Sequence, residues 1–324
     1  MLAKCFYRKE RGLIILSGRE DVDDNMRIEE EQLLDLALDI MEESGALEAY
    51  RYILSHKSNL RSYGSQLYNY LYCLGALAGL KTEALEWMKE AIEVKRYWYR
   101  PTVFEDSDLD SLRSESIFQK CREISEKRYY KELENAKTVC TWDSVKSKKL
   151  ALVLHGNQQN IQMCQKHWEA LKGQGYQVEY VQSKTLDSYN LYRWDDEETI
   201  QLEQVVKTIQ WNKYDSRILC GFSAGCNEIL KNILYAKMKC EGIILQSPWI
   251  PIIETNMTEI LTFIHDNSIW MEIICGREDK DCLYLTEKFA ASARERNIKV
   301  RVEWSEGVGH QYPSNFSEIL DGIQ

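Results

Sequence analysis

The sequence lacks three features, and each absence excludes a class of partner or site. It has no surplus of basic residues, because 51 acidic and 41 basic side chains give a formal net charge of −10. Nucleic acids and anionic membranes bind positively charged surfaces, so neither is expected as the main partner. No apolar run reaches the roughly 18 residues of a membrane-spanning helix, and the first residues lack the apolar core of a signal peptide. We therefore expect a soluble, cytoplasmic protein.

The third absence concerns the spacing of the cysteines. The chain has ten of them, without a Cys-x-x-Cys pair and without a regular interval. They are scattered through apolar and polar stretches, which is typical of proteins in a reducing compartment. The sequence therefore predicts reduced thiols and no zinc or other metal site.

Length and composition predict two folded domains preceded by a short segment. A chain of 324 residues, 44% of them hydrophobic, is long enough to form more than one core. We expect the parts to be residues 1–27, 28–136 and 137–324. The first part contains two strand-like runs, Cys5–Tyr7 and Gly12–Gly18.

Residues 28–136 carry a helical pattern that predicts an all-α, helical-repeat domain. We expect helices from Ile28 to Gly45 and at 46–56, 64–80, 82–95 and 114–134. Two helix pairs align when the sequence is shifted by 35 residues. In this alignment the positions of Leu33, Leu36, Ala49 and Ile53 correspond to those of Tyr68, Leu71, Ala84 and Met88. This period is similar to the tetratricopeptide repeat of about 34 residues, although the Trp and Pro of that motif are missing. The sequence allows three interpretations of this module: a structural appendage, a protein-binding platform or a gate over an active site.

From about Lys148 the pattern changes to alternating strands and helices, which predicts a mostly parallel α/β sheet. The expected strands are 149–154, 177–181, 216–220, 242–246, 269–275 and 299–304, with a further candidate at 138–143. The expected helices are 161–172, 196–211, 224–238, 255–265, 282–296 and 315–322.

The most informative stretch is Gly221-Phe222-Ser223-Ala224-Gly225, which lies between a strand-like run and a helical run. Gly-x-Ser-x-Gly in this context is the pattern of a nucleophile elbow, a sharp strand-to-helix turn. The two glycines have no Cβ, so their backbones can be pressed together around the strained serine. The helix that starts at Ala224 presents free backbone N–H groups, which stabilise a developing negative charge.

Two further polar residues follow later strands, and together with the serine they have complementary chemistry. Asp279 follows the predicted strand 269–275, and His310 follows 299–304. Ligand sites of open α/β sheets form beyond the carboxyl ends of the strands, so the three side chains can converge there. His310 would take the proton of the Ser223 hydroxyl, and Asp279 would orient the imidazole. Asp281 is an alternative to Asp279, which is preferred on its Gly-x-x-Asp spacing.

Residues 140–324 resemble a compact α/β-hydrolase domain of the dienelactone hydrolase and carboxylesterase branch or the prolyl-oligopeptidase-like branch. The resemblance rests on His155-Gly156, Gly221-x-Ser223-x-Gly225, Gly276-x-x-Asp279 and Gly309-His310, in that order. It implies an α/β-hydrolase fold with a mostly parallel sheet, and a Ser…Asp…His triad. Members of the family usually have two antiparallel strands before the His-Gly strand, whereas one candidate is visible here.

The resemblance also implies further site residues. The turn after 149–154 carries the second oxyanion-hole donor in the family, so the backbone N–H of Asn157 or Gln158 would act with that of Ala224. His155 is read as a structural residue of that turn and Ser247 as a turn residue. Candidates for contacts with the substrate are Trp249, which follows 242–246, and Trp194 and Tyr192, which lie in a predicted loop at 184–198.

These residues predict a serine hydrolase that cleaves an ester, thioester or amide bond of a small or medium-sized substrate without a cofactor. An esterase is preferred to a peptidase because nothing in the sequence marks a peptide subsite. Two other functions remain: a protein-binding module that uses the hydrolase fold as a scaffold and recruits a partner through its helical domain, and an acyltransferase on the same fold.

Overall fold

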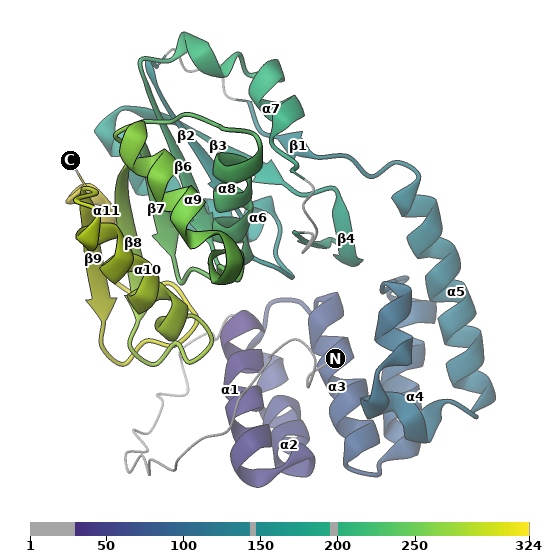
Figure 1. Cartoon of the computed structure of the whole chain (residues 1–324). Coiled ribbons are helices and arrows are strands. Elements are labelled where there is room, and N and C mark those ends of the chain that lie inside the picture. The colour runs from purple at the N-terminus through teal and green to yellow at the C-terminus, as the bar shows by residue number, and fades with distance from the viewer. Residues whose placement is uncertain (1–29, 143–146, 195–199, 324) are drawn as a thin grey trace. The chain divides into compact units, whose positions relative to one another are not determined.

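The computed structural model describes residues 30–142, 147–194 and 200–323 (Figure 1). By its internal contacts the chain divides between Asn135 and Ala136 into two compact units, one helical and one built around a sheet. Each unit has its own hydrophobic core. The strand-like runs predicted within residues 1–27 lie outside the described residues. Within the described ranges 30–142, 147–194 and 200–323, no helix is long and apolar enough to cross a membrane.

The described residues of the first unit, 30–135, fold as helices, as predicted. Its α-helices are α1 (Glu30–Ser44), α2 (Ala46–His56), α3 (Ser65–Leu77), α4 (Lys81–Lys89) and α5 (Ser116–Leu133). The predicted helix 82–95 is divided, because α4 passes into a π-helical turn at Glu90–Val94. Short 3₁₀ turns occupy Lys57–Asn59, Pro101–Glu105 and Ser107–Leu112.

Helix α3 is the centre of this unit. Its residues are apolar or aromatic nearly all round the helix, and all but two, Gln66 and Leu77, are buried or lie in the core. The carboxylate of Glu30 accepts hydrogen bonds from the backbone N–H groups of Gly64 (2.7 Å) and Leu67 (3.2 Å), and so satisfies orphan donors at the start of α3. Of the eight positions paired by the 35-residue offset, seven are buried, whereas Leu36 is 40% exposed. The tetratricopeptide likeness stays a prediction.

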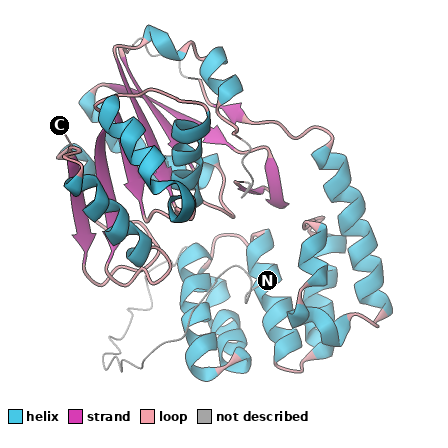
Figure 2. Cartoon of the chain, viewed as in Figure 1, coloured by secondary structure: helices cyan, strands magenta, loops and turns pink. Residues whose placement is uncertain are grey.

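The second unit contains a seven-stranded sheet in the order β1-β3-β2-β6-β7-β8-β9 (Figure 2). Its strands are β1 (Val139–Cys140), β2 (Lys149–Leu154), β3 (Tyr176–Gln182), β6 (Ser216–Phe222), β7 (Gly242–Gln246), β8 (Trp270–Gly276) and β9 (Val300–Ser305). All neighbours are parallel except β1, which pairs antiparallel with β3 at the edge. The predicted mostly parallel sheet is confirmed.

Both faces of the sheet are covered by apolar side chains, which explains why its strands read as continuous apolar runs. Alternate residues of β2 enter two different cores: Leu150 and Leu152 face one, and Ala151 and Val153 face the other. The helices of this unit are α6 (Ile161–Trp168), α7 (Glu203–Thr208), α8 (Ala224–Tyr235), α9 (Ile253–Asp266), α10 (Leu283–Glu295) and α11 (Phe316–Asp321).

The strand order places a switch point between β2 and β6. The chain passes from β2 to β3 on one side of β2 and returns to β6 on the other side. Open α/β sheets bind ligands at such a switch point, beyond the carboxyl ends of the two strands, which here are β2 and β6. His155 follows β2 and Ser223 follows β6.

Two predictions for the stretch 184–211 are wrong. Residues expected as a loop form a hairpin of β4 (Thr185–Ser188) and β5 (Leu191–Arg193), with Asn190 in the left-handed conformation at its turn. The helix predicted over 196–211 is confined, within the described residues, to α7 followed by the 3₁₀ turn Trp211–Lys213. Residues 195–199 lie outside the described part of the chain.

Candidate active site

Ser223 stands on the sharp turn between β6 and α8. Its φ of 53° and ψ of −122° fall in a region that non-glycine residues rarely adopt. The turn is possible because both flanking glycines lack a side chain. A Cβ on Gly225 would lie 2.6 Å from the carbonyl oxygen of His155, and one on Gly221 would lie 2.9 Å from the backbone nitrogen of Cys226. The local sequence therefore produces the elbow that its pattern predicts.

Ser223, His310 and Asp279 form one continuous hydrogen-bonded chain. The Oγ atom of Ser223 lies 2.8 Å from Nε2 of His310, and Nδ1 of His310 lies 2.9 Å from Oδ2 of Asp279. A carboxylate accepts only, so Nδ1 donates to Asp279 and leaves Nε2 as the acceptor for the serine hydroxyl. The imidazole is thereby held in the tautomer that a general base for Ser223 requires.

Asp279 is buried and ionised. Burial by itself would raise the pKa of its carboxyl, but the facing His310 and the hydrogen bonds to the carboxylate outweigh burial and lower the pKa below its ordinary value. One of these bonds comes from the backbone N–H of Cys282, 3.1 Å from Oδ1. Asp279, which is preferred to Asp281 from the sequence, is therefore the carboxyl that lies at Nδ1 of His310.

A glycine brings the acid and base segments together. A Cβ on Gly276 would lie only 2.0 Å from the carbonyl oxygen of Val308, so no larger residue fits there. The backbone N–H of Glu278 donates to the same carbonyl at 3.0 Å. This contact joins the end of β8 to the loop that carries His310, and it explains the spacing Gly-x-x-Asp.

His155 holds the turn after β2, as expected of a structural residue. It is fully buried, its Nδ1 lies 2.6 Å from the carbonyl oxygen of Gly156, and its Nε2 lies 3.2 Å from the backbone nitrogen of Ser183. The Ser183 N–H can only donate, so Nε2 accepts and Nδ1 carries the proton. Burial lowers the pKa of His155 to about 4, which keeps the imidazole neutral.

The structure separates the two candidates for the second oxyanion-hole donor. The backbone N–H of Gln158 donates to the carbonyl oxygen of Tyr192 at 2.7 Å, so it is used within the protein. The prediction that Gln158 serves as a donor is therefore wrong. The role of the Asn157 backbone N–H as an oxyanion-hole donor stays a prediction. The side-chain Oδ1 of Asn157 accepts a hydrogen bond from the backbone N–H of Trp194 at 2.9 Å.

Two residues of the stretch 184–198 that are predicted to contact substrate, Trp194 and Tyr192, form hydrogen bonds with the turn after β2. Trp194 is only 2% exposed, its ring stacks on His155 with centroids 5.1 Å apart, and its Nε1–H donates to the carbonyl oxygen of His155 at 2.7 Å. Tyr192 pairs through its backbone with Gln159 as an isolated bridge. The substrate role predicted for Trp194 is wrong because its ring is enclosed. Tyr192 positions the turn through its main chain.

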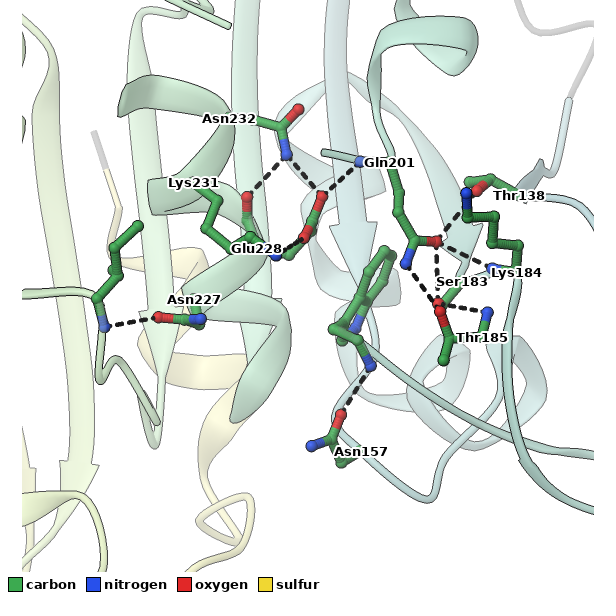
Figure 3. Close-up of polar contacts among 12 residues, drawn as sticks. Thr138, Asn157, Ser183, Lys184, Thr185, Gln201, Asn227, Glu228, Lys231 and Asn232 are labelled. Atoms are coloured by element: carbon green, nitrogen blue, oxygen red, sulfur yellow. Dashed lines mark hydrogen bonds and ion pairs between the residues drawn. The ribbon is translucent and has the colours of Figure 1, made fainter. Parts of the chain in front are cut away.

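Gln201 connects several segments around this turn (Figure 3). Its Oε1 accepts hydrogen bonds from the hydroxyls of Thr138 (3.1 Å) and Ser183 (3.0 Å) and from the backbone N–H of Lys184 (3.0 Å). Its Nε2–H donates to the hydroxyl oxygen of Thr185 at 3.1 Å. One buried amide therefore ties the end of β3 to the start of β4 and to the segment before β1.

The network continues into the helix that follows the nucleophile. The backbone N–H of Gln201 donates to Oε1 of Glu228 at 2.7 Å, and Asn232 donates to the same oxygen at 2.8 Å (Figure 3). Nζ of Lys231 lies 3.4 Å from Oε2 of Glu228, and both side chains are almost fully enclosed. Through Ser183 and Gln201 the network links His155, which holds the turn after β2, to α8.

Four other residues of this unit have no role in the hydrogen-bonded chain described above. Trp249 is half-buried against the larger sheet core, and its predicted contact with substrate stays a prediction. Cys226 is buried, and burial raises its thiol pKa far above the ordinary value, which fits a packing residue. His167 stacks on Tyr312 with ring centroids 3.8 Å apart, and His265 lies exposed beside Asp266.

One group of side chains has the donor types of a metal site. Among the described residues, ligand atoms of Asp279, Cys282 and His310 lie within 4.8 Å of one another. His310 already donates to Asp279, and burial raises the thiol pKa of Cys282 well above its ordinary value, whereas metal binding needs a thiolate. These residues fit a hydrogen-bonded acid and base better than a metal ligand set.

A family model described as "A/B hydrolase-like, N-terminal domain" matches residues 29–133. An uncharacterized protein from Bacillus cereus ATCC 10987 is 31% identical in sequence, with 90% of this chain and 96% of that chain covered and a TM-score of 0.51. No curated protein matches the chain.

Two other solved structures cover a smaller share of this chain with lower similarity. The Bacillus cereus carboxylesterase is 18% identical, with 60% of this chain and 96% of that chain covered and a TM-score of 0.43. Est1E from Butyrivibrio proteoclasticus, with ferulic acid bound, is 12% identical, with 57% and 92% covered and a TM-score of 0.44.

Proposed function

This chain belongs to the α/β-hydrolase superfamily, and on that premise we propose that it is a serine hydrolase acting through an acyl-enzyme on Ser223. The observation that carries the proposal is the hydrogen-bonded chain from Ser223 through His310 to the buried Asp279. The strained turn under Ser223 supports it, because such backbone strain persists where the surrounding structure enforces it, commonly at active sites.

In the acylation step, the Oγ of Ser223 attacks the carbonyl carbon of the substrate while its proton passes to Nε2 of His310. Asp279 stabilises the resulting imidazolium without taking the proton. The negative charge moves to the carbonyl oxygen, where the backbone N–H groups of Ala224 and Asn157 are the proposed donors. The bond to the leaving group then breaks, and His310 returns the proton to that group.

In the deacylation step, water attacks the carbonyl carbon of the acyl-enzyme and gives its proton to Nε2 of His310. The bond between the acyl carbon and Oγ of Ser223 breaks, and the serine oxygen regains the proton. The products are a carboxylic acid and the free enzyme, so the two steps need no cofactor.

We propose carboxylic esters or thioesters of small or medium-sized acids as substrates, with amides as the alternative. The test is hydrolysis of p-nitrophenyl acetate and butyrate compared with an aminoacyl p-nitroanilide. Ester hydrolysis should be measurable, and Ser223→Ala should lower kcat/KM by about a thousand-fold or more. Ser268→Ala is a matched control, since Ser268 is an exposed serine that also has a positive φ.

Two results would change the proposal. Ester hydrolysis that Ser223→Ala leaves intact would contradict the assignment of the nucleophile. Faster cleavage of the anilide than of the esters would replace the esterase by a peptidase-like hydrolase on the same residues.

A further inference from the structure

Three consecutive backbone N–H groups of the turn after β2 have different surroundings. The N–H of Gly156 donates to the side-chain Oε1 of Gln159 at 2.9 Å, and that of Gln158 donates to the carbonyl oxygen of Tyr192 at 2.7 Å. The N–H of Asn157, between them, has no acceptor among the residues that the structure describes. Asn157 is exposed, whereas Gly156 is buried. The turn therefore leaves its middle N–H available to a ligand.

Gln159 forms hydrogen bonds on both sides of this available group. Its side chain folds back over the turn to reach Gly156, and its main-chain carbonyl accepts the N–H of Tyr192 at 3.0 Å. A backbone N–H only donates, so the atom of Gln159 that faces Gly156 is the amide oxygen. The residue is 7% exposed. One buried glutamine therefore closes the turn and joins it to β5 of the hairpin.

The main chain at Gly156 has little freedom to move. A Cβ on this glycine would lie 2.7 Å from Cδ1 of Phe222 and 3.1 Å from Oε1 of Gln159. Phe222 is the last residue of β6 and directly precedes Ser223. Gly156 is thus packed closely against both the Gln159 amide and the end of the nucleophile strand. The amide acts on a part of the turn that adjoins the nucleophile.

Resting on the proposed function, we propose that Gln159 is a positioning residue that aims the N–H of Asn157 at the oxygen of the reacting carbonyl. Negative charge develops on that oxygen only as Ser223 attacks, so a correctly placed donor stabilises the transition state more than the bound substrate. Gln159 itself engages the neighbouring Gly156 and does not need to contact the substrate. A change at Gln159 should therefore lower kcat more than it alters KM.

The experiment measures kcat and KM of Gln159→Met with p-nitrophenyl butyrate. Methionine keeps the length of the side chain and removes the acceptor of the Gly156 N–H. We expect kcat to fall about ten- to a hundred-fold, since loss of a whole oxyanion donor costs about 10²–10³-fold and misplacement costs less. KM should change by less than about two-fold, because the donor acts mainly in the transition state.

A transition-state analogue gives an independent reading of the same donor. Addition of Ser223 to n-propyl trifluoromethyl ketone, which matches the butyrate acyl chain, forms a hemiketal whose oxygen carries the negative charge. The Ki of this ketone for Gln159→Met should rise by about the factor by which kcat/KM falls. The downfield proton resonance of the His310–Asp279 hydrogen bond should keep its position, because Gln159 acts on the turn and not on this pair.

Gln182→Met is the matched control. Oε1 of Gln182, the last residue of β3, accepts the backbone N–H of Ile161 at 3.2 Å. The substitution therefore also deprives a backbone N–H of its glutamine acceptor, but at the start of α6. It should lower the free energy of unfolding by a similar amount and leave kcat and the Ki of the ketone unchanged.

Amide hydrogen exchange tests the proposal on the wild type, and so does not depend on the folding of a variant. The protection factor of the Asn157 N–H should be lower than those of Gly156 and Gln158, whose N–H groups have acceptors. Asn157 protected as strongly as its two neighbours would overturn the positioning role.

The kinetic outcomes separate the two proposals. If the wild type hydrolyses the ester and Gln159→Met keeps its kcat and Ki, the positioning role is overturned and the hydrolase proposal stands. An equal loss of kcat in Gln182→Met, or a displaced proton resonance in Gln159→Met, would also overturn it, because the effect would then be general. A folded wild type that neither hydrolyses esters nor binds the ketone would contradict the hydrolase proposal itself.

Discussion

At the residue scale, the surrounding structure enforces the strained backbone conformation of Ser223 and the neutral form of the His155 imidazole. Ser223 keeps a left-handed φ of 53°, a conformation that costs about 1–3 kcal/mol in a non-glycine residue. His155 is enclosed as a neutral imidazole between the carbonyl of Gly156 and the N–H of Ser183. Both states depend on packing between strand ends, so each makes the site sensitive to changes in the protein around it.

The first prediction at this scale concerns the stability of the protein in acid. Burial lowers the pKa of His155 to about 4 in the folded protein, whereas an unfolded histidine titrates near 6.5. Between these values the unfolded state binds more protons, so the free energy of unfolding falls as the pH is lowered. His155 should contribute a loss of about 3 kcal/mol over this interval.

Urea unfolding of the wild type and of His155→Gln between pH 7 and 4 measures this contribution. The variant will be less stable at pH 7, but its stability should fall less steeply as the pH is lowered. His265→Gln is the control, because His265 is exposed and its removal should leave the slope unchanged. Equal slopes for the wild type and His155→Gln would contradict the assignment of a neutral buried imidazole.

At the element scale, the site is built where strand ends are joined by polar contacts. The ends of β6 and β8 supply Ser223 and Asp279, and the loop after β9 supplies His310. The hairpin of β4 and β5 supports the turn after β2 through the Gln158–Tyr192 hydrogen bond. The candidate site therefore depends on contacts between segments as well as on the side chains of Ser223, His310 and Asp279.

The prediction at this scale tests Gln201, which connects the start of β4 with α8. Gln201→Ala leaves the hydroxyl of Ser183 and the N–H of Lys184 without their acceptor in a buried region. The loss should cost about 2–3 kcal/mol of the free energy of unfolding, since unsatisfied buried polar groups cost about 1–3 kcal/mol each. Gln204→Ala in α7 is the matched control, because the side chain of Gln204 is exposed and its truncation should cost little.

Denaturant unfolding of the two variants measures the difference. The effect of Gln201→Ala should also reach the site, because the same amide supports Ser183 beside His155. Equal free energies of unfolding for the Gln201→Ala and Gln204→Ala variants would show that the hydrogen bonds of Gln201 do not stabilise the protein.

The sequence predicts those elements whose causes are local. Ser223 was found through a spacing that a strained turn requires, and Asp279 through Gly276, whose neighbours leave no room for a side chain. The hairpin of β4 and β5 was missed because a contact distant in sequence, between Gln159 and Tyr192, stabilises it. The only local signal was Asn190, a residue that tolerates the left-handed turn conformation.

The supporting residues carry even less local signal. Trp194 was predicted to contact the substrate because it is an aromatic residue past a strand end. It is buried because the carbonyl oxygen of His155, 39 positions earlier, accepts its ring N–H. Gln246 donates a hydrogen bond to the carbonyl oxygen of Gln311, 65 positions later. Such roles arise from the topology of the sheet and cannot be deduced from spacing within one segment.

At the scale of the whole molecule, the described residues form a helical unit and a second unit built around a mostly parallel seven-stranded sheet. The cores of the two units consist of separate sets of residues, and the Ser223–His310–Asp279 chain lies entirely within the second unit. The role of the helical unit, as an appendage, a protein-binding platform or a gate, stays a prediction. The chemistry proposed here depends on the second unit alone.

The most direct test of the central claim is the intact mass of the whole chain after reaction with a fluorophosphonate probe. We predict one adduct per chain, located on Ser223 by peptide mapping. It should be absent from the Ser223→Ala and His310→Ala variants, whose circular dichroism spectra should match that of the wild type. A folded wild type that gains no adduct, or carries it on another residue, would contradict the account.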